Sequence, residues 1–332
     1  MMMDALVCED FSERPTLVKH RVDAPHVKAG EVRLKVACAG LGFVDALICA
    51  GQYQLRPPLP FTPGSEVAGW VDAVGEGVDT LKPGDRVAAL VTSGALAEYA
   101  IAREALAVRI PDALSFAQAA ASVTNYSTVA YGLGQLGKAA AGETMLVLGA
   151  GGGLGMAALD FGRMLGLRSV ALASTEAKRA AALEQGAAIV LDNGAEDWRQ
   201  NVEAQIGKGA VDIVFDPVGG PASDPAFRTL APGGRHLVLG FAAGEIPRLP
   251  LNLPLLRRSS LVGVDWGGAI RADHKLFRPT FAPIAEALST GALLPARVTA
   301  VTSAGASVSL ARLRNRDVEG KLVVEIEREA GR

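Results

Sequence analysis

The chain has 332 residues, enough for about two domains, and 49% hydrophobic with 20% charged residues is the balance of a folded globular protein. A net charge of −2, with no basic run longer than Arg257-Arg258, argues against a nucleic-acid surface. The methionines at the start are followed by acidic residues, no stretch approaches membrane-spanning length, and the three cysteines lack metal or redox spacing. We therefore expect a cytoplasmic protein with no nucleic-acid or membrane partner.

Residues 1–120 are predicted to form a β-rich domain. The segment from Val32 to Val36 alternates with period two, as a half-exposed strand does. Two further β-prone runs follow, Val67 to Val74 and Arg86 to Leu90. Turn signals such as Lys82-Pro83-Gly84-Asp85 separate these strands, so a small barrel or sandwich is expected.

Near Ser115, a candidate helix N-cap, the pattern changes to alternating strands and helices. This alternation predicts an α/β domain with a doubly wound parallel sheet. Its strands are expected at 145–149, 169–173, 188–191, 211–215, 235–240 and 260–265. The tail is predicted to contain a helix near 281–290 and strands near 296–301 and 321–327, which pack back onto the first segment. The predicted domains are residues 1–120 and 121–265, with a return segment, 266–332, that completes the first domain.

The stretch from Met145 to Leu165 combines an apolar run, a cluster of glycines and an apolar helical pattern. A strand, a glycine turn and a helix in this order are typical of a dinucleotide-binding unit, in which the helix N-terminus receives the pyrophosphate. The spacing of the glycine motif is met with alanine in the first place. The loop alone does not exclude the alternative that this is a glycine-rich turn between a strand and a helix that binds no ligand. The cofactor-binding candidates here are Ala150, Gly151, Gly152, Gly153, Leu154 and Gly155.

The residues after the second strand of this domain favour NADPH over NADH. An NAD site usually has a carboxylate there for the ribose 2′-hydroxyl, whereas this chain has Ser174, Thr175 and Lys178. Hydroxyls and a cation suit a 2′-phosphate, which a carboxylate would repel. In the alternative interpretation, Lys178 and Arg179 form a solvated helix face and Glu176 serves NAD.

Other cofactors and reaction types are disfavoured by what the sequence lacks. The four histidines stand apart from one another and from the cysteines, so no zinc ligand set is predicted. There is no Tyr-x-x-x-Lys pair, no Gly-x-Ser-x-Gly elbow and no Walker A lysine. We therefore expect a metal-free protein that is neither a short-chain reductase, a hydrolase nor a nucleotide triphosphatase.

A series of spaced motifs supports a family resemblance. They are Val44-Asp45, Gly51-Gln52-Tyr53, Pro58-Leu59-Pro60-Phe61-Thr62-Pro63-Gly64-Ser65-Glu66-Val67-Ala68-Gly69, Val74-Gly75-Glu76-Gly77-Val78, Pro83-Gly84-Asp85-Arg86-Val87, Ala97-Glu98-Tyr99, Asp216-Pro217-Val218-Gly219-Gly220, Gly240-Phe241-Ala242 and Gly320-Lys321. Over nearly its whole length the chain resembles the zinc-free, zeta-crystallin-like quinone oxidoreductases of the medium-chain dehydrogenase/reductase superfamily.

The resemblance implies a GroES-like β-rich catalytic domain and a Rossmann NADPH-binding domain, with the cofactor in the cleft between them. It implies hydride transfer from NADPH to a quinone or to the β-carbon of an α,β-unsaturated carbonyl compound, without zinc. Gly42 and Ser65 stand where zinc-dependent relatives carry a catalytic Cys and His. Homodimers joined through the edge strand at 260–265 are also implied. Further cofactor-binding candidates that follow from the resemblance are Asn193, Gly240, Phe241, Trp266 and Lys321.

Three residues are candidates for the catalytic role, each with a structural alternative. Tyr53 and Tyr126 could donate to a carbonyl oxygen, or could pack with their hydroxyls satisfied locally. Asp45 could deliver a proton, or could fix the backbone near it. Phe241 and Trp266 could equally be core aromatics or cofactor contacts.

Three departures from the family pattern bear on the substrate. Many relatives have Asn in place of Gly42, Tyr in place of Asn193 and His in place of Tyr131. We expect Gly42 to leave the pocket roomier and without a side-chain donor for an oxyanion. The acceptor stays open between a quinone, an enone and an acryloyl- or enoyl-CoA; for CoA the available basic residues are Arg56, Arg257 and Arg258. A non-catalytic NADPH-binding sensor or structural protein is the remaining alternative.

Overall fold

The computed structural model describes residues 1–294 and 297–326 and divides the chain into two compact units. The first unit contains residues 1–124, 272–291 and the described residues after 294; the second contains residues 125–271 and 292–294. The boundaries between the units fall after residues 124 and 271, a few residues later than the predicted boundaries after 120 and 265. Residues 295–296 and 327–332 of the predicted return segment lie outside the described residues.

The first unit is organised around β3 (Glu31–Leu41), which pairs antiparallel with three other strands. Those partners are β4 (Glu66–Val74), β6 (Tyr99–Arg103) and β15 (Lys321–Glu325). The sheet is completed by β5 (Arg86–Leu90), β7 (Ala107–Arg109) and β14 (Val298–Val301), and β1 (Met2–Cys8) pairs separately with β2 (Leu17–Asp23). Val32, Leu34 and Val36 of β3 are buried while the residues between them are partly exposed, which confirms the predicted alternation.

The end of the chain packs onto its beginning, as predicted. Strand β15 pairs with β3, and α10 (Ala306–Arg314) packs on α1 (Phe43–Cys49). The expected strands near 296–301 and 321–327 correspond to β14 and β15; their residues 296 and 327 lie outside the described part of the chain. Helix α9 (Phe277–Thr290) begins earlier than predicted, and the short helices α1 and α10 were missed because neither has a clear start signal.

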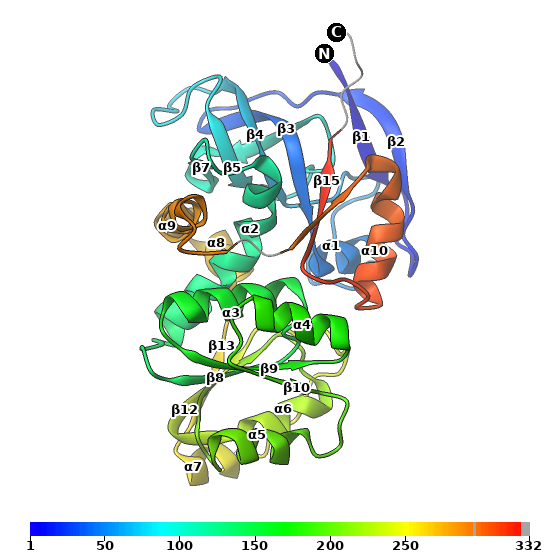
Figure 1. The fold of residues 1–332 in the computed structure, drawn as a ribbon. Helices are drawn as coiled ribbons and strands as arrows, with labels where there is room; N and C mark the ends of the chain where they lie inside the picture. The colour runs from blue at the N-terminus through cyan, green and yellow to red at the C-terminus, as the bar shows by residue number, and fades with distance from the viewer. Residues whose placement is uncertain (295–296, 327–332) are drawn as a thin grey trace. The chain divides into compact units, whose positions relative to one another are not determined.

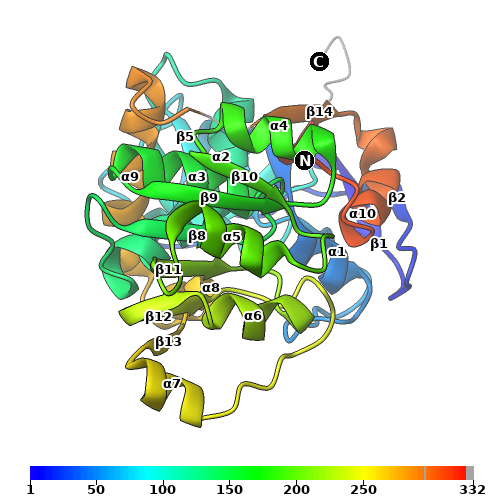
Figure 2. The same ribbon diagram turned by 60° about the horizontal axis from the view of Figure 1, so that its bottom comes forward.

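The second unit is a six-stranded parallel sheet in the order β10-β9-β8-β11-β12-β13 (Figure 2). Its strands are β8 (Thr144–Val147), β9 (Arg168–Ala173), β10 (Ile189–Asp192), β11 (Val211–Asp216), β12 (Leu230–Val238) and β13 (Ser260–Gly263). Every strand predicted for this domain is present, with ends shifted by up to five residues. The order reverses between β8 and β11, and a sheet of this kind binds ligands at such a switch point, outside the carboxyl ends of the strands.

Helices cover both faces of this sheet (Figure 1). Helices α3 (Gly153–Met164) and α4 (Glu176–Glu184) lie over one face, and α5 (Trp198–Ile206) and α6 (Ser223–Phe227) lie over the other. The remaining helices include α7 (Asn252–Arg257) and α8 (Trp266–Ala272).

Helix α2 (Phe116–Val129) carries the chain from the first unit into the second. It begins as predicted, because the Ser115 hydroxyl accepts the Gln118 N–H at 3.2 Å as an N-cap. The helix then continues as a π-helix over Ala130–Leu136.

The glycine stretch allows α3 to start directly against the end of β8. A Cβ atom at Gly155 would lie 2.4 Å from the Gly149 carbonyl oxygen and 2.6 Å from the Ala150 Cα, so no larger residue fits there without a backbone shift. The close approach brings the first turn of α3 onto the strand ends. The fold therefore places a helix N-terminus at the switch point of the sheet.

Candidate functional site

The first turn of α3 is open toward the carboxyl edge of the sheet. Gly152 is the N-cap, and a Cβ atom built on it would meet only the Gly149 carbonyl oxygen, at 3.5 Å. The N–H groups that begin a helix have no intrahelical partner and form the positive end of its dipole. The glycine loop is thus a cradle without side chains, which fits a pyrophosphate group.

Lys178 lies against this loop. A Cβ atom at Gly151 would stand 2.6 Å from the Lys178 Cβ, so the aliphatic stem of the lysine lies across the glycine. The Thr175 hydroxyl caps α4 by accepting the Lys178 N–H at 3.2 Å, and Ser174 is exposed beside it. The structure therefore brings the predicted 2′-phosphate residues to the glycine loop, although the Thr175 hydroxyl already accepts a hydrogen bond as a helix cap.

Arg179 has a different position from Lys178. It pairs with Asp192 at the end of β10 (N–O distance 3.1 Å), and its guanidinium reaches the Ala173 carbonyl oxygen at 3.4 Å. Asn193 follows Asp192, is exposed, and donates its backbone N–H to the same carbonyl oxygen. Arg179 thus joins the ends of β9 and β10, whereas Lys178 faces the loop.

The other cofactor candidates of the second unit differ in how exposed they are to solvent. Gly240 and Phe241 lie in the loop after β12, with the Phe241 ring 40% exposed. Trp266 is only 3% exposed and packs on Tyr131, with ring centres 5.4 Å apart. The structure therefore favours the core-aromatic alternative for Trp266, because its ring is buried and packs on Tyr131.

Tyr126 is likewise engaged inside the second unit. Its buried hydroxyl lies 2.9 Å from Asp160 Oδ2 and 2.7 Å from the Leu294 carbonyl oxygen. The Asp160 carboxylate also accepts from Arg163, and burial raises the pKa of this carboxyl group. Of the two alternatives for Tyr126, the structure favours packing with a locally satisfied hydroxyl, and we no longer assign it a catalytic role.

The first unit contains a buried cluster of three charged side chains. Asp45, Glu66 and Lys321 are 3%, 2% and 4% exposed. Lys321 donates to Glu66 Oε1 at 2.5 Å, while Glu66 Oε2 accepts the Thr124 N–H at 3.1 Å. Because the ammonium is buried against Glu66, the structure favours an ion-pairing role for Lys321 over the predicted cofactor contact.

The pKa of Asp45 is shifted by its place in this cluster. Burial and the charge of Glu66 raise its pKa to about 6, although the Gly42 N–H (2.8 Å) and Lys321 favour the ionised form. Asp45 occupies the third position of α1, so its carboxylate fixes the backbone at the start of that helix. The geometry thus supports the backbone-fixing alternative and leaves a carboxyl group that exchanges a proton near pH 6.

Gly42 lies beside the charged cluster. A Cβ atom at this position would point at the charged cluster, 3.3 Å from Lys321 Nζ, 3.5 Å from Asp45 Oδ2 and 3.7 Å from Glu66 Oε1. A Cβ would thus make close to ordinary contacts with the ends of three side chains, and the expectation that Gly42 leaves the pocket roomier stays a prediction.

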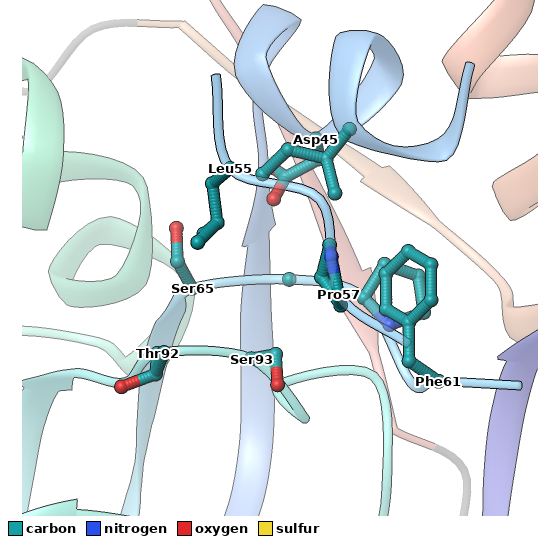
Figure 3. A pocket seen from close by; sticks show the side chains of 10 residues that line it. Asp45, Leu55, Pro57, Phe61, Ser65, Thr92 and Ser93 are labelled. Carbon is teal, nitrogen blue, oxygen red and sulfur yellow. The ribbon is translucent and has the colours of Figure 1, made fainter. Parts of the chain in front are cut away.

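A shallow pocket of about 250 Å³, a volume that includes open solvent, lies next to Asp45 in the first unit (Figure 3). Its lining is apolar on one side and carries three hydroxyl groups on the other. The lining residues are Asp45, Ile48, Leu55, Pro57, Phe61, Pro63, Gly64, Ser65, Thr92 and Ser93. Apart from Asp45, no charged side chain lines it, so a hydrogen-bond acceptor at this pocket would meet neutral hydroxyl groups.

Tyr53 belongs to the same segment as Leu55 and Pro57 but does not line this pocket. It is half-buried, and within residues 1–294 and 297–326 its hydroxyl makes no hydrogen bond. The pocket hydroxyls and the Glu66 partner of Lys321 were not predicted as site residues. For Ser65 and Glu66, the signal was the run from Phe61 to Gly69, which supported the family resemblance; no motif included Thr92 or Ser93.

Two features are absent from residues 1–294 and 297–326. These residues contain no group of three or more His, Cys, Asp or Glu side chains placed to hold a metal ion. They also contain no helix long and apolar enough to cross a membrane.

Comparison with known proteins gives matches in both units. The model of the alcohol dehydrogenase GroES-like domain matches residues 28–112, and that of the zinc-binding dehydrogenase family matches residues 153–282. Quinone oxidoreductase-like protein 2 of Bos taurus is 34% identical over 292 residues, which cover 88% of this chain and 83% of that protein. The quinone oxidoreductase of Homo sapiens is 33% identical over 266 residues, covering 79% of this chain and 80% of that one. A mycobacterial structure complexed with NADPH has a TM-score of 0.88 at 28% identity, covering 97% of this chain and 99% of that chain.

The two matched domains and the fold define a medium-chain dehydrogenase/reductase. Within that superfamily, the chain belongs to the quinone oxidoreductase family, as the sequence resemblance predicted.

The pKa of Asp45 predicts how stability depends on pH. Because the folded-state pKa of about 6 exceeds the ordinary value of 3.8, the unfolded chain releases this proton first, and stability falls as the pH rises from about 4 to 6. Asp45→Asn removes that contribution, so its stability relative to the wild type should increase over this range by roughly 2–3 kcal/mol. Urea unfolding at pH 4, 5, 6 and 7 measures the difference. Asp10→Asn, at an exposed carboxylate, is the control and should show no such trend; a constant gap for Asp45→Asn would contradict the assignment.

Proposed function

We propose that this chain is an NADPH-dependent, zinc-independent reductase that transfers a hydride to a quinone or an α,β-unsaturated carbonyl compound. The observation that carries the cofactor assignment is the stem of Lys178 lying across Gly151, so that a basic residue adjoins the glycine loop. The NADPH complex of a structural relative agrees with this assignment. NADPH supplies the hydride and its electron pair.

The residues of this chain have separate tasks in the proposed reaction. The open N–H groups at the start of α3 bind pyrophosphate oxygens, and the ammonium of Lys178 with the Ser174 hydroxyl binds a 2′-phosphate. In the first unit, the hydroxyl of Ser65, which lines the pocket, donates a hydrogen bond to the carbonyl oxygen of the acceptor, on which negative charge develops.

Proton supply to the reduced acceptor is the second requirement. Asp45 lines the pocket and holds a proton up to about pH 6. Above that pH its carboxylate is ionised, so solvent is the source of the proton there. Asp45 is therefore a proton reservoir in mild acid and a backbone anchor at all pH values.

Zinc independence rests on the residues at the metal positions of the family. Gly42 has no side chain, and a serine hydroxyl at Ser65 is a poor zinc ligand compared with thiolate or imidazole. The buried ammonium of Lys321 lies 3.3 Å from where a Cβ of residue 42 would be and pairs with Glu66, so that carboxylate already has a cation partner.

A panel of acceptors tests the function. Purified protein is supplied with NADPH and a quinone, an enone or crotonyl-CoA, before and after dialysis against a metal chelator. We expect oxidation of NADPH with the quinone or enone, with less than a twofold change after dialysis. Turnover with crotonyl-CoA alone would identify an enoyl-CoA reductase instead. Tight NADPH binding without turnover of any acceptor would identify a sensor or structural protein, and loss of activity on dialysis would refute zinc independence.

The cofactor preference is predicted to depend on Lys178. Lys178→Ala should raise the Kd for NADPH by about 10- to 100-fold, because a charge-assisted hydrogen bond to phosphate contributes roughly 1.5–3 kcal/mol. The Kd for NADH, which lacks the 2′-phosphate, should change less than threefold. Fluorescence titration of both cofactors measures this. Lys208→Ala, at an exposed lysine of the same unit, is the matched control; an equal loss for both cofactors would refute the role.

We also propose that the chain forms a homodimer through β13. This strand ends the parallel sheet, and its Leu261 is exposed together with Leu255 and Leu256 of α7. An unpaired strand edge beside exposed leucines is a surface that a second copy can cover by extending the sheet. Light scattering after gel filtration should therefore show a dimer that Leu261→Asp converts to a monomer. Val308→Asp, at an exposed apolar residue of α10, is the control; a monomeric wild type would end this proposal.

A further inference from the structure

A buried polar network occupies the end of β11, at the switch point of the sheet. Asp216, the last residue of β11, is enclosed together with Ser223 and His236. Asp216 Oδ2 accepts the Ser223 hydroxyl at 2.5 Å and lies 3.0 Å from His236 Nε2. Because an ionised carboxylate can only accept, we assign the proton of this hydrogen bond to Nε2. From sequence, His236 was only an isolated histidine, because its partner lies 20 residues away on the neighbouring strand.

The other oxygen of Asp216 holds the turn that follows β11. Oδ1 accepts the backbone N–H groups of Val218 at 2.9 Å and of Gly219 at 2.8 Å. These hydrogen bonds, with those from Ser223 and His236, outweigh the effect of burial and lower the pKa of Asp216. The carboxylate therefore accepts four hydrogen bonds, two of which come from the backbone of the turn at 217–220.

This turn touches both loops that the proposed cofactor site uses. On one side, Val218 lies against the glycine loop, since a Cβ atom at Gly149 would stand 2.8 Å from Val218 Cγ2. On the other side, the Ala243 N–H donates to the Val218 carbonyl oxygen at 2.8 Å, and the Ala242 N–H donates to that of Pro217 at 3.3 Å.

Phe241 itself rests on the same turn. A Cβ atom at Gly219 would lie 2.7 Å from Phe241 Cδ1, and the Gly220 N–H donates to the Glu245 carbonyl oxygen at 3.0 Å. The carboxyl ends of β8, β11 and β12 are adjacent in the sheet (Figure 2), so the turn lies between the loops that follow its two neighbours.

We propose that the Ser223–Asp216–His236 network is the positioning element of the cofactor site, which holds the glycine loop and the segment 240–244 at a fixed spacing through the turn at 217–220. The inference rests on the proposed NADPH-dependent function. None of the three side chains needs to touch the cofactor. Their contribution is pre-organisation, since the free protein then has the loop geometry that binding requires.

Variants of His236 separate positioning from packing. His236→Leu removes the donor to Asp216 but keeps an apolar side chain, whereas His236→Gln keeps an N–H donor. Phe227→Leu is the matched control, because the Phe227 ring stacks on His236 (centres 6.0 Å apart) and takes no part in the hydrogen bonds. Ser223→Ala removes a second donor with little change in volume.

Two readouts are measured on each variant. The first is the Kd for NADPH, and the second is hydrogen exchange of the backbone amides at 217–220 and 241–244 in the absence of cofactor. For His236→Leu and Ser223→Ala, we expect a Kd about tenfold higher and faster exchange in these two segments, as for the loss of one hydrogen bond to a charged group. His236→Gln should restore both readouts to within about threefold of the wild type. Phe227→Leu should lower the melting temperature and leave both readouts within that margin.

The outcomes that overturn the inference are distinct from a failure of the function. If His236→Leu and Phe227→Leu raise the Kd alike, or if His236→Leu leaves the exchange of both segments unchanged, the network only stabilises the fold. If the wild-type protein does not bind NADPH, the proposed function fails. The exchange measurement then still decides whether the network holds the two segments.

Discussion

Close approach of backbone to backbone at the carboxyl edge of the parallel sheet is the constraint on which the second unit depends. At Gly155 and Gly149 a Cβ atom would collide with neighbouring chain segments, so α3, the glycine loop and the turn after β11 can meet only because side chains are absent. The open N-terminus of α3 is a result of this packing. What binds there is decided by the few side chains that remain at the edge, above all Lys178.

In the first unit, the corresponding constraint is the burial of charged side chains. The carboxylates of Asp45 and Glu66 and the ammonium of Lys321 lie together in its interior, where Lys321 pairs with Glu66. With one more negative than positive group, the cluster is least costly when one carboxyl group is protonated, and Asp45 is the group whose pKa is raised to about 6. Charge balance and the anchoring of α1 are therefore properties of the same side chain.

The amino-acid sequence predicts local features well and side-chain partners poorly. Period-two alternation in β3, the Ser115 N-cap and the strands of the second unit depend on neighbours in sequence, and the structure confirms them. Tyr126 and His236 have partners 34 and 20 residues away, so no local pattern could show that the first hydroxyl is engaged or that the second residue is paired. For the same reason, no local pattern could show that Gly42 lies near Lys321, which comes from the far end of the chain. The family resemblance supplied the GroES-like identity of the first domain and the activity class, which composition and periodicity alone left open.

The position of Lys178 across Gly151 has a consequence for how cofactor preference can change. Any side chain at residue 151 would displace the lysine stem, so the two positions are not independent in evolution or in engineering. A variant that replaces Lys178 with a small residue frees the space over the loop, and only then can residue 151 be larger than glycine. A change of cofactor preference therefore has an order of steps, in which the lysine is replaced before the glycine.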